Sequence, residues 1–492
     1  MKEINLHDYF AEEDIKKLQN DLNDPSNTIF NNSLSLVDRT LLKKTLFKIL
    51  RQKLQRENYL INVLNYLEKD INSDMTNTSI NSLNSNNNEY KSLTNFLSNN
   101  THIKLNQKFI SENNLENLRS REVSVSKVKS LIVNPNALND IKINNTLNNF
   151  LSFSEDVISN IETQEFNIFK LEEQVGKENT LSVIGCYIFT NYYLYYLFPY
   201  MKLENFFRAI TLGYHRENPY HTDLHAADVT QSCMLYVIKA KLKDYLKLND
   251  KDLASLYISC IVHDFKHPGV NNAFLTNIHS PIAIRYNDTD VLEAYHISQT
   301  FKLIKSDEKY NIFENMSIED YKYCRKRMIG FVLATDMVFH FKQFNFLKDK
   351  VKEFEIVKGN NRDKIIEGMD EKKFYDYQQD LLEIIVHACD ISNPTKPWSI
   401  YPFWAEACVS EFFLQGDLEK KLGMKVSPNF DRETTSLPGS QIGFMNFIVS
   451  PFFNSLIDIF PELEFLGENI KINLENMKKL KEEEDKKKEE KK

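Results

Sequence analysis

The 492-residue chain is poor in glycine and proline, with 12 and 13 of these residues respectively. Both residues mark tight turns, so their scarcity argues against a sheet protein with many short loops and favours helices. An apolar fraction of 42% is sufficient for a sizeable core. The length allows two or three domains, or one large domain with extensions.

An excess of positive charge is also lacking, since the net charge is -8. This balance argues against a general nucleic-acid binder, whose electrostatic footprint would be basic. The N-terminus has no apolar signal-peptide core. The most membrane-like run, residues 192–200, is interrupted by Pro199 and falls short of the ~20 apolar residues that a span needs. We therefore expect a cytoplasmic protein without a membrane span.

The cysteine pattern points the same way, because no two cysteines have the CxxC spacing of a metal or redox motif. Buried free thiols in a reducing compartment are the expected state of these residues. The six are Cys186, Cys233, Cys260, Cys324, Cys389 and Cys408.

Composition divides the chain into four parts. Residues 1–70 form an N-terminal helical, regulatory region, and residues 71–150 an Asn/Ser-rich linker or insert. The polar tract within this linker cannot bury enough apolar surface to offset its ordering entropy, so the N-terminal extension is expected to be partly disordered. Residues 151–465 form the main domain, and residues 466–492 a charged tail that is either a solvated helix or disordered.

The segment Arg39–Arg56 contains seven basic residues and no acidic one. Its leucines at 42, 46, 50 and 54 recur at four-residue spacing, which predicts a basic amphipathic helix. Such a helix can be a calmodulin target, the site of another regulator, or a membrane-surface helix. The plainer interpretation, a helix docked on its own domain with a solvated basic face, is preferred.

The main domain shows apolar residues at three- and four-residue spacing and no sustained period of two, which predicts an all-α, compact multi-helix fold. The predicted helical segments are Leu181–Phe198, Asp228–Lys239, Leu253–Val262, Ile318–Phe341, Phe374–Cys389, Trp404–Phe413 and Gln441–Ile457.

Residues that can bind metal flank three of these segments. His263 and Asp264 are adjacent, and neutral imidazole and carboxylate oxygen both suit a divalent ion. A His-Asp pair alone is weak evidence for a metal site, because such dipeptides also occur by chance. Upstream, His221 and His225 are four apart and share one face if the segment is helical. Downstream, Asp390 follows an apolar run at a predicted helix end.

If His225, His263, Asp264 and Asp390 converge, they form a mixed nitrogen and oxygen site suited to Zn²⁺. Asp264 can also reach a second, harder ion such as Mg²⁺ or Mn²⁺. Two such ions at ~3.5–4 Å would activate a hydroxide and hold a phosphoryl group for in-line attack. The plain alternative for each residue is a satisfied core or capping side chain, and for His387 alone that interpretation is preferred.

Three further residues fit supporting roles in such a site. His221, near the metals without needing to bind one, suits a general acid for an alkoxide leaving group because imidazole titrates near neutral pH. His267 and Glu293 suit positions beside the ligands, where they would orient a ligand or a water.

These residues resemble a known family, the class I cyclic-nucleotide phosphodiesterases of the HD superfamily. Within that family they are similar to the cAMP-specific and calmodulin-stimulated members. The resemblance covers roughly residues 169–457 through ordered motifs. These lie at 220–229 (YHTDLHAADV), 263–272 (HDFKHPGVNN), 286–288 (YND), 291–293 (VLE), 334–337 (ATDM), 388–394 (ACDISNP), 411–417 (EFFLQGD) and 440–444 (SQIGF).

The resemblance implies a role for each matched position. His225, His263, Asp264 and Asp390 would hold the first metal, Asp264 would reach the second, and His221 would protonate the O3′ leaving group. Gln441 would hydrogen-bond the purine edge through its amide, and Phe444 would stack on the base. Further residues would line the substrate pocket, namely Tyr220, Met337, Ile391, Asn393 and Cys408.

Departures from the family pattern are few. Thr222 stands where the family usually has Asn, and Ala294 and Tyr295 stand where Asn and His are frequent. Neither change removes a predicted ligand. Cys408 takes the place of a branched aliphatic residue against the base, and a smaller side chain there would loosen that contact and alter substrate preference.

The expected substrate is cAMP, because Asn393 and Tyr401, which can restrain the Gln441 amide, resemble cAMP-preferring members. A cGMP-preferring or dual-specificity enzyme is the close alternative. A catalytically silent cyclic-nucleotide-binding scaffold would have lost a metal ligand, and none is lost. An HD-type hydrolase of another phosphoester would not need the purine-binding segment around Gln441. A homodimer remains open.

Overall fold

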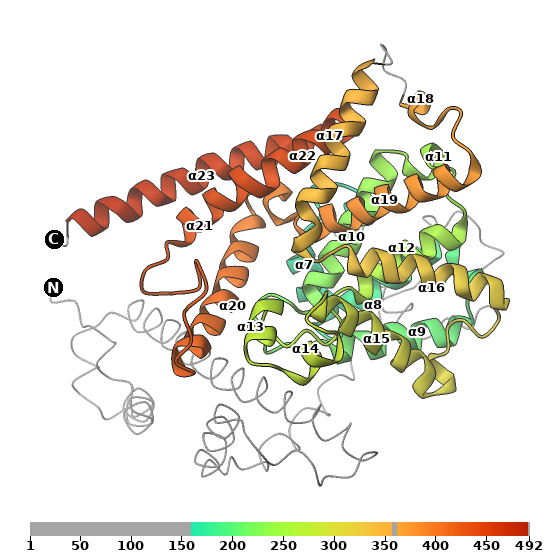
Figure 1. The fold of residues 1–492 in the computed structure, drawn as a ribbon, viewed down its shortest axis with the longest axis horizontal. Helices are drawn as coiled ribbons and strands as arrows, with labels where there is room; N and C mark the ends of the chain where they lie inside the picture. The colour runs from blue at the N-terminus through green and yellow to red at the C-terminus, as the bar shows by residue number, and fades with distance from the viewer. Residues whose placement is uncertain (1–158, 357–361, 491–492) are drawn as a thin grey trace, which may run out of the picture. The chain divides into compact units, whose positions relative to one another are not determined.

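The computed structural model describes residues 159–356 and 362–490. The predictions for residues 1–70 and 71–150, and the basic segment Arg39–Arg56, lie outside these residues. Within them the secondary structure is helical and contains no strand, which confirms the all-α prediction (Figure 1).

The first part of the fold runs from α7 to α15. Its helices are α7 (Ile168–Val175), α8 (Thr180–Asn191), η4 (Leu194–Leu197), α9 (Tyr200–Gly213), α10 (Asp223–Lys239), α11 (Leu242–Tyr245), α12 (Asp250–Val262), α13 (Asn272–Asn277), α14 (Pro281–Arg285) and α15 (Val291–Ser306).

The second part continues to the C-terminal helix. It comprises η5 (Glu308–Tyr310), α16 (Ile318–Leu333), η6 (Met337–Phe339), α17 (His340–Ile356), α18 (Asp363–Ile366), α19 (Glu371–Asp390), η7 (Asn393–Thr395), α20 (Tyr401–Lys421), α21 (Leu437–Phe444), η8 (Met445–Val449), α22 (Ser450–Ile459), η9 (Pro461–Leu463) and α23 (Glu464–Glu489).

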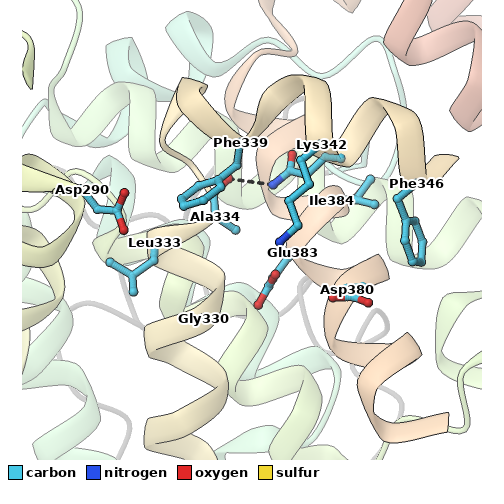
Figure 2. Close-up of a pocket in the computed structure, with 11 residues that line it drawn as sticks. Asp290, Gly330, Leu333, Ala334, Phe339, Lys342, Phe346, Asp380, Glu383 and Ile384 are labelled. Atoms are coloured by element: carbon cyan, nitrogen blue, oxygen red, sulfur yellow. Dashed lines mark hydrogen bonds between the residues drawn. The ribbon is translucent and has the colours of Figure 1, made fainter. Parts of the chain in front are cut away.

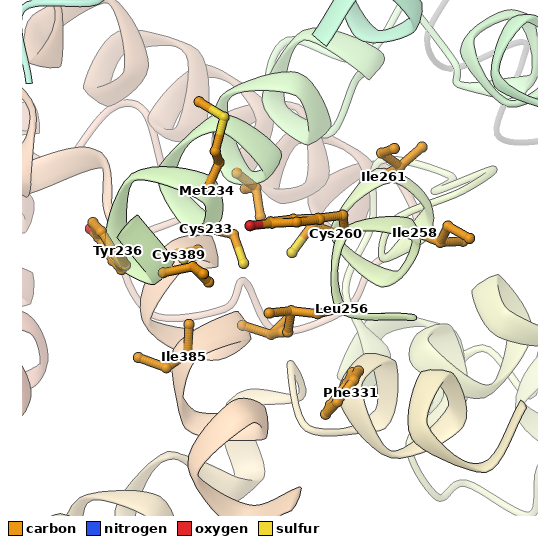
Figure 3. Close-up of a cluster of buried hydrophobic side chains, with 14 of the residues drawn as sticks. Cys233, Met234, Tyr236, Leu256, Ile258, Cys260, Ile261, Phe331, Ile385 and Cys389 are labelled. Atoms are coloured by element: carbon orange, nitrogen blue, oxygen red, sulfur yellow. The ribbon is translucent and has the colours of Figure 1, made fainter. Parts of the chain in front are cut away.

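Helix α10 lies at the centre of the helical stack, where it packs against α8, α12 and α19. All but three of its residues are buried. Cys233, Cys260 and Cys389 come from α10, α12 and α19 and belong to one apolar cluster (Figure 3). All six cysteines are free, and five of them are buried, as the sequence predicts. The core therefore fixes the relative positions of the helices that carry the predicted ligands.

Two predicted helices are interrupted. The segment 181–198 ends its α-helix at Asn191, because Tyr193 takes a left-handed conformation with φ 57° before η4 begins. The segment 318–341 breaks after Leu333, where the Asp336 side chain accepts the Val338 N–H at 2.9 Å and starts η6. Short polar residues that hydrogen-bond their own backbone favour such new helix starts.

The C-terminal tail is helical, which decides between the two alternatives for this segment. Helix α23 continues across the predicted boundary at 465/466 and buries Leu466, Ile470, Asn473 and Met477. Asn473 Nδ2 donates to the carbonyl oxygens of Pro394 and Lys396, both at 2.8 Å. The helix thus supports the loop that follows Asp390.

The most apolar long helical run in the described residues is Leu437–Ile459, not 192–200 as we expected from the sequence. It is long and apolar enough to cross a membrane by composition, with a mean hydropathy of 1.4. Met445, Val449, Phe452 and Phe453 along it are fully buried within the protein. The absence of a membrane span stays a prediction.

Candidate metal centre and active site

The four residues predicted to bind metal lie together. One ligand atom from each of His225, His263, Asp264 and Asp390 lies within 4.8 Å of the others. His225 Nε2 is 3.0 Å from Asp390 Oδ1, and His263 Nε2 is 3.1 Å from Asp264 Oδ2. The two Nε2 atoms are 3.4 Å apart. Side chains 165 positions apart in sequence thus share one centre.

Helix ends bring these four side chains together. His225 lies in the first turn of α10, His263 and Asp264 directly follow α12, and Asp390 is the last residue of α19. Because α10 packs against both other helices, the three ends meet at one point. His221 precedes α10, so it does not share a helix face with His225 as the four-residue spacing suggested.

The orientations of the two imidazole rings suit a cation. His263 Nδ1 is 2.9 Å from the Cys260 carbonyl oxygen, to which it donates, and this leaves the Nε2 lone pair directed at the centre. His225 also directs Nε2 at the centre. Two electron-rich nitrogens at 3.4 Å beside two carboxylates fit a divalent cation between them.

The local charge supports the same conclusion. Burial disfavours a protonated His263, yet the carboxylates of Asp264 and Asp390 outweigh burial and raise the pKa of His263 well above 6.5. The two carboxylates therefore strongly stabilise positive charge at this position. The residues present fit a metal ion in charge, ligand type and arrangement.

His221 is held by Glu411 of α20. One oxygen of the Glu411 carboxylate contacts His221 Nδ1. The other oxygen accepts the backbone N–H groups of Tyr220 at 2.9 Å and His221 at 3.0 Å. Burial would lower the pKa of His221, but the charges of Glu411 and Asp264 raise it to about 9. The imidazole is therefore protonated at neutral pH.

His267 stacks on His221, with ring centroids 3.9 Å apart and an interplanar angle of 18°. Its Nδ1 accepts the Gly269 N–H at 2.9 Å, so a neutral ring carries its proton on Nε2. Burial and the neighbouring His221 lower the pKa of His267 well below 6.5. His267 thus remains neutral beside a charged His221.

Glu293, at the start of α15, belongs to a second group of acidic residues, which also contains Asp336. Asn272 Nδ2 donates to Glu293 at 3.0 Å and to Asp336 at 3.2 Å. Burial, together with the Asp336 charge, raises the pKa of Glu293 to about 8. His296, one turn further along α15, lies 3.7 Å from Asp264 Oδ1 through its Nε2.

Two side-chain hydrogen bonds involve residues predicted to contact a base. The Tyr220 hydroxyl donates to Asn393 Oδ1 at 2.5 Å, and the Tyr220 ring lies 4.5 Å from the His225 ring. The Tyr401 hydroxyl donates to Gln441 Oε1 at 2.9 Å. This bond is the restraint on the Gln441 amide that the sequence suggested.

The other predicted pocket residues differ in exposure. Ile391 is buried, whereas Cys408 and Phe444 are half-buried against the core. Met337 starts η6 and is 45% exposed. The expectation that all of these residues line one pocket remains a prediction.

A buried ion pair holds the loop after Asp390. Lys396 Nζ lies 2.8 Å from Asp228 Oδ1 and 2.8 Å from Ser232 Oγ, both on α10. Lys396 is 8% exposed and Asp228 is 2% exposed. The pair ties the segment that carries Asn393 to the helix that carries His225.

A cavity of about 270 Å³ lies between α16, α17 and α19 (Figure 2). Its walls include Phe339 at the end of η6 and Lys342 at the start of α17, with Asp380 and Glu383 on α19. None of the predicted site residues lines this cavity.

Sequence reasoning missed three residues of this site. Glu411 and Asp336 were present in recognised motifs without a role, and His296 had no predicted role. A signal for Glu411 exists, because it follows Trp404 and Cys408 along one helical face of α20. An acidic residue on an apolar face predicts a buried partner.

The domain is all-helical, and two imidazoles and two carboxylates meet where its helices end. Together they define a helical protein whose ligand set suits a divalent metal. Residues 220–470, just over half of the chain, match the model of the 3'5'-cyclic nucleotide phosphodiesterase family. The chain belongs to this family, whose members use divalent metals.

Curated relatives agree with this assignment. Over 299 residues the chain is 38% identical to the probable 3',5'-cyclic phosphodiesterase pde-1 of Caenorhabditis elegans. This matched region covers 60% of this chain and 42% of that protein. Over 307 residues it is 34% identical to the dual specificity calcium/calmodulin-dependent 3',5'-cyclic nucleotide phosphodiesterase 1C of Mus musculus. This matched region covers 62% of this chain and 40% of that protein. The chain thus spans less than half the length of these two relatives.

Solved structures share the fold. The structure of LmjPDEB1 in complex with IBMX is similar with a TM-score of 0.60 and 27% identity, covering 68% of this chain and 97% of that chain. The phosphodiesterase domain of the Salpingoeca rosetta rhodopsin phosphodiesterase has a TM-score of 0.60 over 69% of this chain and 98% of that chain. At 24% identity, the second comparison concerns the fold alone.

Proposed function

We propose that this protein is a 3',5'-cyclic-nucleotide phosphodiesterase that hydrolyses cAMP, and also cGMP, to the 5'-nucleoside monophosphate and so ends cyclic-nucleotide signalling. The observation that carries the proposal is the convergence of His225, His263, Asp264 and Asp390 on one centre in a chain of this family. A catalytically silent scaffold would not need an intact ligand set.

In this proposal His225, His263, Asp264 and Asp390 would hold a tightly bound Zn²⁺, and Asp264 would also serve a second ion, Mg²⁺ or Mn²⁺. When bound, such ions lower the pKa of a coordinated water and neutralise the phosphate charge. The protein itself fixes the ligand directions, through the Cys260 carbonyl behind His263 and the helix ends that carry the other ligands.

His221 acts as the general acid that protonates the O3′ leaving group. Glu411 holds the ring by its Nδ1 atom, which leaves Nε2–H free of that contact. A pKa of about 9 keeps the proton on the ring at neutral pH until the leaving oxygen develops charge. His267 stacks on the ring and fixes its plane, while Glu293 and Asn272 orient groups near Asp264.

Gln441, Phe444 and their neighbours recognise the base. Tyr401 donates to Gln441 Oε1, which leaves the Gln441 Nε2 group to donate to a purine acceptor. The bond favours this amide orientation without excluding the reverse one, because a hydroxyl can also accept a hydrogen bond. This modest bias supports cAMP as the preferred substrate and cGMP as a further one.

The test is hydrolysis by the full chain, measured as initial rates over a concentration series of cAMP and cGMP, with and without chelator. Metal-dependent release of AMP or GMP is expected. Binding of cyclic nucleotide without turnover would instead indicate a scaffold. Faster hydrolysis of bis-p-nitrophenyl phosphate than of either cyclic nucleotide would indicate a phosphohydrolase of another class.

We also propose that calmodulin regulates the enzyme. The named relative from mouse is calcium/calmodulin-dependent, and the basic segment Arg39–Arg56 offers the charge and leucine spacing of a calmodulin target. Calcium-loaded calmodulin would then change the turnover of the full chain but not of a chain lacking residues 1–150.

The proposed compartment is the cytoplasm. Sedimentation would decide whether the enzyme is a homodimer.

A further inference from the structure

Helices α15 and α16 lie side by side in the helical stack (Figure 1). Their side chains line a surface groove that the proposed function does not use. Residues 294–305 of α15 form one wall, and residues 321–333 of α16 form the other. At a rise of 1.5 Å per residue these walls are about 16–18 Å long, or roughly three helical turns. Its volume is about 790 Å³.

The floor of the groove is apolar. Ile297 and Phe301 are 5% and 6% exposed at its bottom, and Ile329 and Leu333 lie half-buried beside them. Ala294, at a position where the family often has Asn, also lines the groove. A small side chain here leaves the apolar floor open at the end nearest Glu293.

The rim of the groove is strongly basic. Lys302, Lys305, Lys322 and Arg325 line it, and no aspartate or glutamate of the described chain does so. The described residues also provide no salt-bridge partner for any of these four side chains. Four unpaired cations around an apolar floor contrast with the net charge of -8 for the whole chain.

Arg325 is already held in place for a contact across the groove. Its guanidinium lies 3.9 Å from the centroid of the Phe301 ring, in a cation–π arrangement. This contact spans the two helices and limits the rotamer entropy that Arg325 would lose on binding an anion. The planar guanidinium suits a carboxylate.

We propose that this groove is a docking site for an acidic amphipathic helix of a partner protein. The length of the groove matches about three turns of helix, and apolar residues at i, i+3, i+4 and i+7 would fill its floor. Glutamates or aspartates beside that stripe would meet the four cations of the rim. A flat bilayer surface would not reach Ile297 and Phe301 at the bottom, so the shape favours a convex helix over a membrane.

The test measures binding of a designed probe to the full chain. The probe is a fluorescent peptide of about fourteen residues, or roughly four turns, with leucines at i, i+3, i+4 and i+7 and glutamates beside them. A scrambled peptide of the same composition controls for charge alone. Vesicles of phosphatidylcholine with phosphatidylserine test the membrane alternative.

Two variants examine the rim and the floor separately. Lys302→Glu/Arg325→Glu reverses the rim charge, and the matched control Lys471→Glu/Lys478→Glu makes the same charge change on exposed residues of α23. Ser298→Trp fills the groove with no change in charge. Circular dichroism and the thermal midpoint identify any variant that is misfolded.

The proposal predicts that the designed peptide binds at least about tenfold more tightly than the scrambled one. The rim reversal and Ser298→Trp should each weaken binding about tenfold or more, whereas the α23 control should leave it within about twofold. Equal binding of both peptides, or unchanged binding to either groove variant, would overturn the proposal. Binding of the vesicles without binding of the peptide would also overturn it.

Discussion

The Glu411 carboxylate contacts the His221 ring with one oxygen and accepts the backbone N–H groups of Tyr220 and His221 with the other. One buried acid therefore fixes the orientation, the tautomer and the charge of the proposed general acid. His221 and Glu411 lie 190 positions apart, and α20 brings them together.

Glu411→Gln should lower kcat about 10- to 100-fold, the usual cost of losing an orienting partner. The amide retains the shape of the side chain but not its charge, so the pKa of His221 should fall. The alkaline limb of the pH–rate profile should then move to lower pH. An equal loss of kcat at every pH, with no shift of this limb, would limit Glu411 to a structural role.

The pH dependence of the unaltered protein follows from the same pair. The general acid acts in its protonated form, and the pKa of His221 is raised to about 9. Turnover should therefore persist through neutral pH and fall as the pH rises through about 9, where the imidazole loses its proton. The check is kcat measured from pH 6 to about pH 10 with saturating metal. A limb near the ordinary histidine pKa of about 6.5 would contradict this prediction.

Asp390→Ala should abolish metal binding at the tight site without unfolding the domain. The substitution removes one of two carboxylates that stabilise positive charge there, and a ligand should cost more than the roughly 100-fold of an outer partner. Elemental analysis of bound zinc and the rate of cAMP hydrolysis provide the measurement. Asp376→Ala, an exposed residue of α19, is the control and should change neither quantity. Full metal content in Asp390→Ala would exclude Asp390 as a ligand.

Lys396→Met should destabilise the domain by about 3–5 kcal/mol, because it leaves the Asp228 carboxylate buried and unpaired. The double variant Asp228→Leu/Lys396→Met should recover much of that loss. Urea unfolding measures both. The control Lys373→Met removes a pair in which both side chains are more than half exposed, and should change the free energy of unfolding by less than about 1 kcal/mol. A single variant as stable as this control would show that the buried pair contributes little.

Tyr401→Phe should alter the choice between purines. Loss of the hydroxyl removes the bond to Gln441 Oε1, worth about 1 kcal/mol or roughly fivefold. The amide would then rotate more freely, and the ratio of kcat/KM for cAMP and cGMP should approach one. The measurement is that ratio for both proteins, and an unchanged ratio would remove Tyr401 from substrate selection.

Much of the metal centre could be predicted because its ligands occur in short local motifs. The pair His263-Asp264 is adjacent, and His225 and Asp390 lie next to segments whose apolar periodicity predicts helices. The partner of His221 was not predictable in this way. No local spacing relates positions 221 and 411, because only the packing of α20 brings them together.

Helix boundaries were the weaker part of the sequence prediction. Apolar spacing continues from Ile318 to Phe341, although the chain leaves the helix after Leu333 and begins again near Met337. The local hydrogen bond of Asp336 to the Val338 N–H overrides the periodicity there. Similarly, no periodic signal distinguishes the π-helical turn at Met445–Val449 from an ordinary helix.

That π-helical turn adds one residue between α21, which carries Gln441 and Phe444, and the core helix α22. One residue corresponds to a rotation of about 100° around a helix axis. Deletion of the exposed Asn446 would make the helix regular. With Phe452 and Phe453 kept in the core, Gln441 and Phe444 would then turn about a quarter of a circle. The side chains proposed to select the nucleotide thus depend on a single extra residue in the backbone.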